Sequence, residues 1–177
     1  MKPEEIGGSI EFRFGVCLVP WDGDPEKYVT EIEGDITIWA DSDDDAPNEK
    51  VGTIKLLVVK LAEALSKGVE LAFILDCEAI ESLYRKLFER DGEFRPTLGI
   101  MAPYGDLLVI EDIQLDPRLD DAAFRDQVIE TAIATFASVG VVVLPKRLVP
   151  GQILQDRGYV GLRGSDYAVR DNYRMLG

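Results

Sequence analysis

The sequence predicts a single α/β (α+β) domain, spanning residues 1–177, in which helices flank a sheet. Residues 107–110 are apolar on both faces and residues 116–117 close the stretch with Asp-Pro, which is typical of a buried strand. Residues 122–136 repeat apolar side chains at helical spacing. A chain of 177 residues is long enough to bury a sizeable core within one domain.

The N-terminal part, residues 10–61, predicts a meander of three strands. We expect these strands at residues 10–19, 28–40 and 51–61, with a turn at residues 21–25 and a polar loop at residues 41–48. In the second strand one face should carry Ile32, Ile36, Ile38 and Ala40. Thr37 and the acidic residues should occupy the opposite face.

A helix over residues 76–89 follows, and Asp76 is a suitable N-cap for it. Its apolar face should contain Ile80, Leu83, Leu87 and Phe88. Residues 91–104 contain two glycines and two prolines, so we predict a connecting loop there.

The C-terminal half predicts a strand–helix–strand core over residues 107–145. Its elements should be a strand at 107–115, lying inside the sheet, a helix at 121–137 and a strand at 140–145. A short helix and strands should follow over residues 151–171, ending in a strand or hairpin at 159–170. In the long helix, the face toward the sheet should carry Phe124, Val128, Ala132 and Phe136, widened by Ile129 and Ile133. Asp126, Gln127 and Glu130 should face water.

The composition excludes several classes of function. The formal net charge of −14 repels nucleic acid and anionic membranes, so we expect neither as a partner; an acidic mimic of nucleic acid fits the charge alone. The absence of histidine removes imidazole bases and histidine metal sites. Cys17 and Cys77 lie in apolar sequence, which indicates buried free thiols. No signal core or spanning apolar run is present, which predicts a cytoplasmic protein.

Four stretches resemble motifs of the GNAT superfamily of N-acetyltransferases. They are the strand, Asp116-Pro117 turn and helix of residues 106–136, VGVVVLP at 139–145, QILQDRGY at 152–159 and GSDYAV at 164–169. Residues 35–39, 55–59 and 74–78 are more loosely similar to uncharacterised bacterial GNAT-like proteins. The resemblance implies a mixed, mostly antiparallel sheet flanked by helices. It also implies an acetyl-CoA donor whose pyrophosphate rests on the amides at the helix start.

The donor loop departs from the family pattern. The positions of the family's Arg-Gly-x-Gly-x-Gly turn fall on residues 120–125, DDAAFR, which contain no glycine. The resemblance places the donor site at Ile113, Gln114, Leu115, Asp120, Asp121 and Arg125. We expect Asp120 to cap the helix instead, so that Asp120 or Asp121 takes up the helix amides. Arg118 and Arg125 should then pair with Asp121, Asp126 or Glu130.

The chemistry that the resemblance implies has few candidate residues. A carboxylate on the central strand often serves as the base in this superfamily, and Glu111 is the candidate, its neighbour Asp112 pointing to the other face. The position of the family's tyrosine acid falls on Leu154. Tyr159 and Tyr167 match core aromatic positions.

Two further charged stretches have open interpretations. Lys146-Arg147 belongs to a solvent-facing loop or meets an anionic ligand. The run from Asp41 to Asp45 can be interpreted as a hairpin loop or as a calcium loop. Its spacing fits a calcium loop poorly, so we expect no metal site.

Two hypotheses follow for function. The first is a GNAT-like protein that has lost acetyl-CoA-dependent transfer, needs no cofactor, and acts as a binding or regulatory module for a protein or small-molecule partner. The alternative is an active N-acyltransferase that accepts acetyl-CoA or another acyl-CoA donor through an atypical loop.

Overall fold

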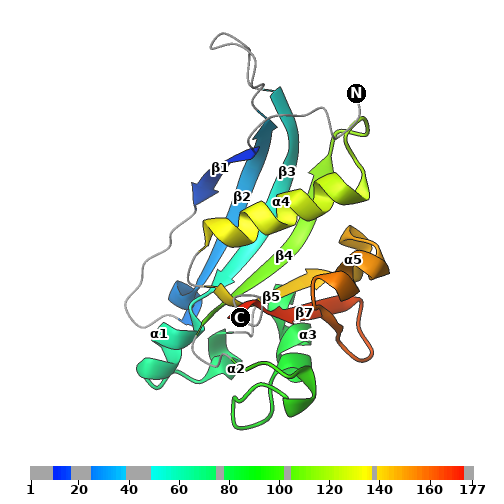
Figure 1. The fold of residues 1–177 in the computed structure, drawn as a ribbon. Coiled ribbons are helices and arrows are strands. Elements are labelled where there is room, and N and C mark those ends of the chain that lie inside the picture. Colours follow the sequence, from blue (N-terminus) through cyan, green and yellow to red (C-terminus); the bar gives the residue numbers. More distant parts are fainter. Residues whose placement is uncertain are drawn as a thin grey trace.

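In the part of the chain that the structure describes, seven strands form one mixed, mostly antiparallel sheet in the order β1-β2-β3-β4-β5-β7-β6. Figure 1 shows the sheet, with every strand labelled except β6. The computed structural model describes residues 10–16, 25–38, 49–74, 78–101, 105–136 and 139–173. The strands are β1 (Ile10–Val16), β2 (Val29–Ile38), β3 (Glu49–Val59), β4 (Asp106–Leu115), β5 (Val139–Pro145), β6 (Val160–Gly161) and β7 (Tyr167–Asp171). All neighbouring pairs are antiparallel except β4 and β5, which run parallel.

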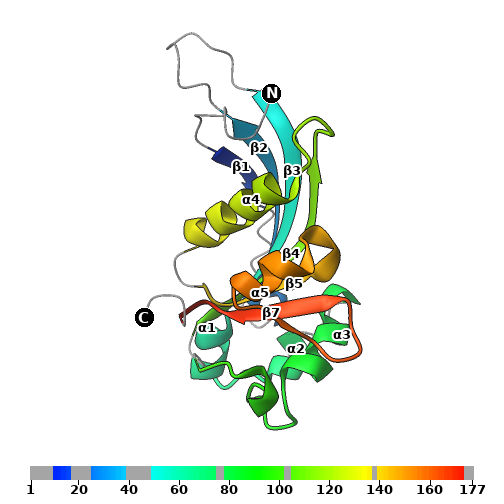
Figure 2. The same cartoon turned by 45° about the vertical axis from the view of Figure 1, so that its right-hand side comes forward.

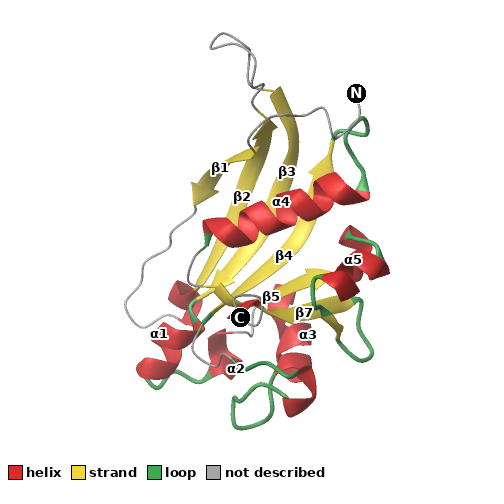
Figure 3. Ribbon diagram, in the orientation of Figure 1, coloured by secondary structure: helices red, strands yellow, loops and turns green. Residues whose placement is uncertain are grey.

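Helices cover both faces of this sheet (Figure 3). The α-helices are α1 (Leu61–Ser66), α2 (Leu71–Ile74), α3 (Glu78–Leu87), α4 (Ala122–Thr135) and α5 (Gly151–Asp156). Among the described residues, three short 3-10 segments connect elements, namely η2 (Pro25–Tyr28), η3 (Pro96–Leu98) and η4 (Lys146–Leu148). Helix α4 lies across the strands of the meander, and α1, α2 and α3 gather below the end of the sheet near β7 (Figure 2).

The buried side chains form two clusters, one on each face of the sheet. The first joins the sheet to α4 and α5, and the second joins it to α1, α2 and α3. Strand β4 contributes to both, because Leu108 and Ile110 belong to the first cluster and Leu107 and Val109 to the second. The prediction of an interior strand that is apolar on both faces is therefore confirmed.

The strand–helix–strand prediction is confirmed by β4, α4 and β5, and the helix prediction before it by α3. Helices α1 and α2 were not predicted. Residue 61, expected to end a strand, begins α1. Asp76, Cys17, Cys77, the turn at 21–24 and the loop at 41–48 lie outside the described residues.

The stripe predicted on α4 is confirmed for its central residues. Phe124, Val128, Ile129, Ala132 and Ile133 are buried. Phe136 ends the helix as its C-cap and is only partly buried, although it packs against the same cluster. The stripe therefore weakens at the C-terminal end of α4.

The expectation that Asp126 and Glu130 face water is wrong, whereas Gln127 is exposed as expected. Asp126 pairs with Arg157 at 2.6 Å, and Glu130 pairs with Arg170 at 2.7 Å. Because the segment after α5 and strand β7 supply these arginines, both carboxylates are partly covered.

Thr37 is also buried, at 6% exposure, where the alternation placed it toward solvent. The alternation itself holds, because Ile36 and Ile38 both belong to the first cluster, so the opposite face of β2 is also covered at Thr37.

Strands β4 and β5 separate soon after they begin, and this separation positions the site. They pair only from Asp106 to Val109 on β4. A Cβ on Gly105 would collide with the backbone of Gly140, so the two chains approach closely where the strands start. Farther along, β4 remains paired with β3, whereas β5 remains paired with β7. The β3–β4 register also shifts, because Leu56 faces Ile110 while Lys55 faces Asp112, which leaves Glu111 as the extra residue of a bulge.

Candidate functional site

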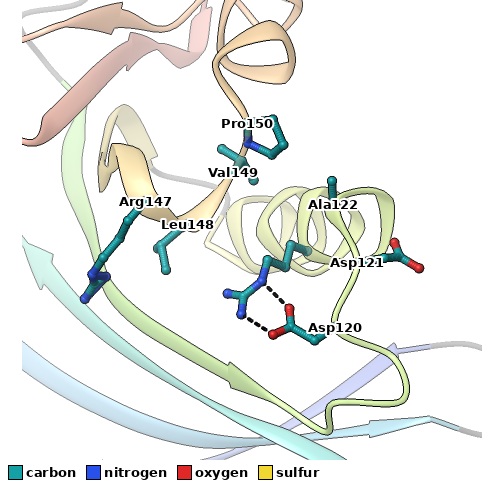
Figure 4. A pocket seen from close by; sticks show the side chains of 8 residues that line it. Asp120, Asp121, Ala122, Arg147, Leu148, Val149 and Pro150 are labelled. Carbon is teal, nitrogen blue, oxygen red and sulfur yellow. Dashed lines mark hydrogen bonds and ion pairs between the residues drawn. The ribbon is translucent and has the colours of Figure 1, made fainter.

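A pocket of about 350 Å³ opens between the start of α4 and the segment that leads from β5 to α5 (Figure 4). This volume lies at the lower end of the range for ligand pockets. The lining residues are Asp120, Asp121, Ala122, Arg125, Arg147, Leu148, Val149 and Pro150. The site thus combines four charged side chains with an apolar wall.

Asp121 caps α4. Its backbone is extended, with φ −118° and ψ 167°, and its Oδ1 accepts a hydrogen bond of 2.8 Å from the Phe124 amide. The Asp121 carbonyl accepts from the Arg125 amide at 3.0 Å, which closes the first turn. The specific assignment of the cap to Asp120 is therefore wrong, and the broader expectation that one of the two aspartates takes up a helix amide is confirmed.

Asp120 instead forms a two-point ion pair with Arg125. Arg125 donates from Nε to Asp120 Oδ1 and from Nη2 to Oδ2, the latter at 2.9 Å. The hydrogen bond from Arg125 is the main reason that the pKa of the Asp120 carboxyl lies below its ordinary value. Arg125 Nη1 also donates to the Ile113 carbonyl of β4 at 3.1 Å. The prediction that Arg125 pairs with Asp121, Asp126 or Glu130 is therefore wrong.

The observed partners of Arg118 also differ from the expected ones. It pairs with Asp116 and with Glu49, each at 2.7 Å. Hydrogen bonds from the Arg118 side chain and amide lower the pKa of the Asp116 carboxyl to about 2. These contacts tie the turn after β4 to the start of β3 and draw Arg118 out of the pocket.

Arg147 stands on the opposite wall of the pocket from Asp120 (Figure 4). Its Nη2 donates to the Glu111 carbonyl at 3.3 Å and to Asp112 Oδ1 at 3.2 Å. Its side chain is 60% exposed, so these bonds are loosely held. Both Lys146 and Arg147 are exposed, as one interpretation of this pair expected, but Lys146 is directed elsewhere and donates to the Ser165 carbonyl at 2.8 Å.

The side chain of Glu111 does not line the pocket. The charged groups that act on it are Glu31, Glu33, Lys55 and Asp112. Burial raises the pKa of the Glu111 carboxyl above its ordinary value, repulsion from Glu31 adds to the effect, and Lys55 opposes it. The structure therefore separates the predicted base from the predicted donor turn, and only the main chain of Glu111 touches a pocket residue.

The three β4 positions expected in the donor site contribute little to the pocket. Ile113 is buried and offers only its carbonyl, to Arg125. Gln114 is exposed and donates to Asp112 at 3.1 Å. Leu115 packs against the core on the α4 side.

The aromatic and apolar positions of the C-terminal motifs are structural. Leu154 and Tyr159 are both buried at 8% exposure, and Tyr167 packs against the cluster of α1 to α3. The Arg170 guanidinium lies 4.8 Å from the centre of the Tyr159 ring. Within the described part of the chain, no group forms a hydrogen bond with the Tyr159 hydroxyl, and burial raises the pKa of that hydroxyl. The core assignment is confirmed for Tyr159, whereas Tyr167 is only partly buried against the second cluster.

Sequence reasoning missed the wall formed by Leu148, Val149 and Pro150. A signal was available, because Pro145 and Pro150 bracket a short segment that has to bend away from the end of β5. Prolines favour such irregular connections, but their spacing alone does not tell which neighbour the segment will face.

Across the described residues, no three or more acidic or cysteine side chains gather as a metal site would require. The described helices include none with the length and apolar content that crossing a membrane requires. A scan against protein-family models and a search of curated proteins found no match to this sequence.

Proposed function

We propose that this chain is a GNAT-type protein that has lost acetyl-CoA-dependent acyl transfer and acts as a binding or regulatory module. The mixed, mostly antiparallel sheet and the helices on both of its faces agree with the fold that the motif resemblance implies. The pocket beside the start of α4 supports a binding role.

The observation that carries this proposal is that two aspartates occupy the turn before α4. Asp121 already accepts from the Phe124 amide, and Asp120 stands next to it. A phosphate ~4 Å from one carboxylate costs on the order of 4 kcal/mol near a protein surface. Such a cost weakens binding by several hundredfold or more. Arg125 offsets part of the charge of Asp120, but both groups of that ion pair are already engaged with each other.

The apolar Leu154 supports the loss of catalysis independently. It is buried at the position where the family pattern has a tyrosine acid. A leucine has no proton to give, so a leaving thiolate would lack this donor.

Calorimetric titration with acetyl-CoA tests the proposal. We expect no measurable binding of micromolar strength and no acetyl transfer to amines above background. The Asp120→Gly/Asp121→Gly double variant should raise any residual affinity, because it removes two negative charges and frees the Phe124 amide. An Asp91→Gly/Glu93→Gly variant, which removes equal charge from an exposed turn, is the matched control. Micromolar binding to the unmodified protein that the double variant alters would overturn the proposal.

The alternative is an active N-acyltransferase that uses an acyl-CoA donor through an atypical loop. Glu111 favours it, because this carboxylate sits at the β4 bulge with a pKa raised by burial, as a general base near neutral pH requires. An assay of thiol release from acyl-CoA in the presence of amines distinguishes the two functions. The alternative expects turnover that Glu111→Gln abolishes and that Glu70→Gln, at an exposed position, leaves in place.

A further inference from the structure

Two arginines cover the edge of β4 that faces the gap left by β5. Arg147 donates to the Glu111 carbonyl and Arg125 to the Ile113 carbonyl, two residues farther along. Carbonyls two residues apart in a strand point to the same edge, where a neighbouring strand would otherwise donate. Since β5 pairs with β4 only as far as Val109, side chains take the place of a further strand.

Each of these arginines also binds a carboxylate, in the same arrangement. Arg147 joins the Glu111 carbonyl to Asp112, and Arg125 joins the Ile113 carbonyl to Asp120. A basic side chain near a strand edge that lacks its partner therefore satisfies both acceptors. This is the chemistry that an external chain would need in order to bind at the same place.

The two arginines differ in how firmly they are held. The Arg125 side chain is 19% exposed and makes three hydrogen bonds. The Arg147 side chain is 60% exposed, and its two bonds are 3.2 and 3.3 Å long. Exposed ion pairs of this kind contribute little to stability, so Arg147 is the replaceable one.

We propose that the gap between β4 and β5 binds an extended basic peptide of another protein, which displaces Arg147 while the Asp120–Arg125 pair stays in place. A main-chain amide of the peptide donates a hydrogen bond to the Glu111 carbonyl in place of Arg147. The arginine or lysine side chain of the peptide forms the ion pair with Asp112. The peptide then lies beside Leu148 and Val149, which line the pocket and are themselves 3% and 5% exposed. This mode adds a short strand segment to an unpaired sheet edge.

Charge complementarity selects a basic partner. The chain carries a formal net charge of −14, which attracts cationic peptides and repels acidic ones. Glu31 and Glu33 of β2 and Lys55 of β3 act electrostatically on Glu111. This inference rests on the proposed binding role, since it names the ligand of that same site.

The test uses two blocked pentapeptides, Gly-Val-Arg-Val-Gly and Gly-Val-Glu-Val-Gly, titrated into isotope-labelled full-length protein and followed by NMR. We expect the arginine peptide, but not the glutamate peptide, to shift the signals of Glu111, Asp112, Leu148 and Val149. The Arg147→Met variant should bind it about two- to fivefold more tightly, because a competing cation is gone. The Asp112→Asn variant should bind it about two- to fivefold more weakly. Arg90→Met, which removes an equal charge from an exposed turn, should leave the affinity unchanged.

Several results would overturn the inference. They are equal shifts with both peptides, shifts confined to other surfaces, no shift at millimolar concentrations, or weaker binding by Arg147→Met. The acetyl-CoA titration separates this inference from the proposed function. Absence of peptide binding together with absence of acetyl-CoA binding overturns only the inference, whereas micromolar acetyl-CoA binding overturns the proposed function whatever the peptides do.

Discussion

Replacing Asp121 with alanine should destabilise the protein by removing the cap of α4. The Asp121 carboxylate accepts one hydrogen bond, of 2.8 Å, from the partly buried Phe124 amide. Loss of such a cap costs about 0.5–2 kcal/mol. Because the amide is partly buried and no side chain replaces the acceptor, we expect about 1–2 kcal/mol, or a fall in Tm of about 2–8 °C for a chain of this length.

Two companion variants separate capping from charge. Asp121→Ser keeps an oxygen acceptor and should cost less than about 1 kcal/mol, which includes the loss of a favourable charge at the helix N-terminus. Asp120→Ala removes a partly exposed ion pair and should cost about 0.2–1 kcal/mol. Reversible urea unfolding followed by circular dichroism gives all three free energies. If Asp120→Ala costs more than Asp121→Ala, or if serine fails to restore stability, the reasoning on the cap is refuted.

Three further predictions concern the core, an ion pair and pH. Phe124→Ala should cost about 3–5 kcal/mol and the half-buried Phe136→Ala about half as much; equal losses in urea melts would contradict the observed burial. Glu130→Ala removes the ionic partner of the buried Arg170 guanidinium and should cost about 2–3 kcal/mol of stability. This cost is less than for a fully buried pair, because the Glu130 side chain is 29% exposed. As a control on the same helix, Gln127→Ala should change stability by less than about 0.5 kcal/mol. The raised pKa of the Glu111 carboxyl means that its stabilising contribution is present below the ordinary value of 4.5 and is lost as pH rises through the raised pKa. Glu111→Gln should therefore gain stability relative to the unmodified protein as pH rises from below 4.5; the opposite trend would show that the pKa is not raised.

The elements that were predictable share a strong local pattern. Strand β4 is apolar on both faces near its start, and α4 repeats its apolar residues over several turns. Helices α1 and α2 have six and four residues, too few for a periodic signal. Leu61, Ala64, Leu71 and Ile74 are buried against the sheet, so packing rather than propensity supports these short helices.

The partners of the arginines in and around the site were harder to predict, because they are distant in the chain. Arg118 reaches Glu49, 69 residues away, and Arg157 reaches Asp126, 31 residues away. Arg147 contacts Asp112 across the gap between two strands. Local spacing carries no information about such contacts, and one sequence offers several acidic partners for each arginine.

The sequence by itself determined the class of the fold and the positions of its central strand and longest helix, because burial imposes a period on each element. It also determined that two carboxylates precede α4, one of which takes up an amide of the first turn. Only the tertiary structure decided that Asp121 is the cap and Asp120 the partner of Arg125, since that choice depends on the backbone angles at which the turn joins the helix. It likewise decided that β5 leaves β4 after Val109 and that arginines cover the exposed edge, because strand separation depends on how each strand packs against its other neighbour.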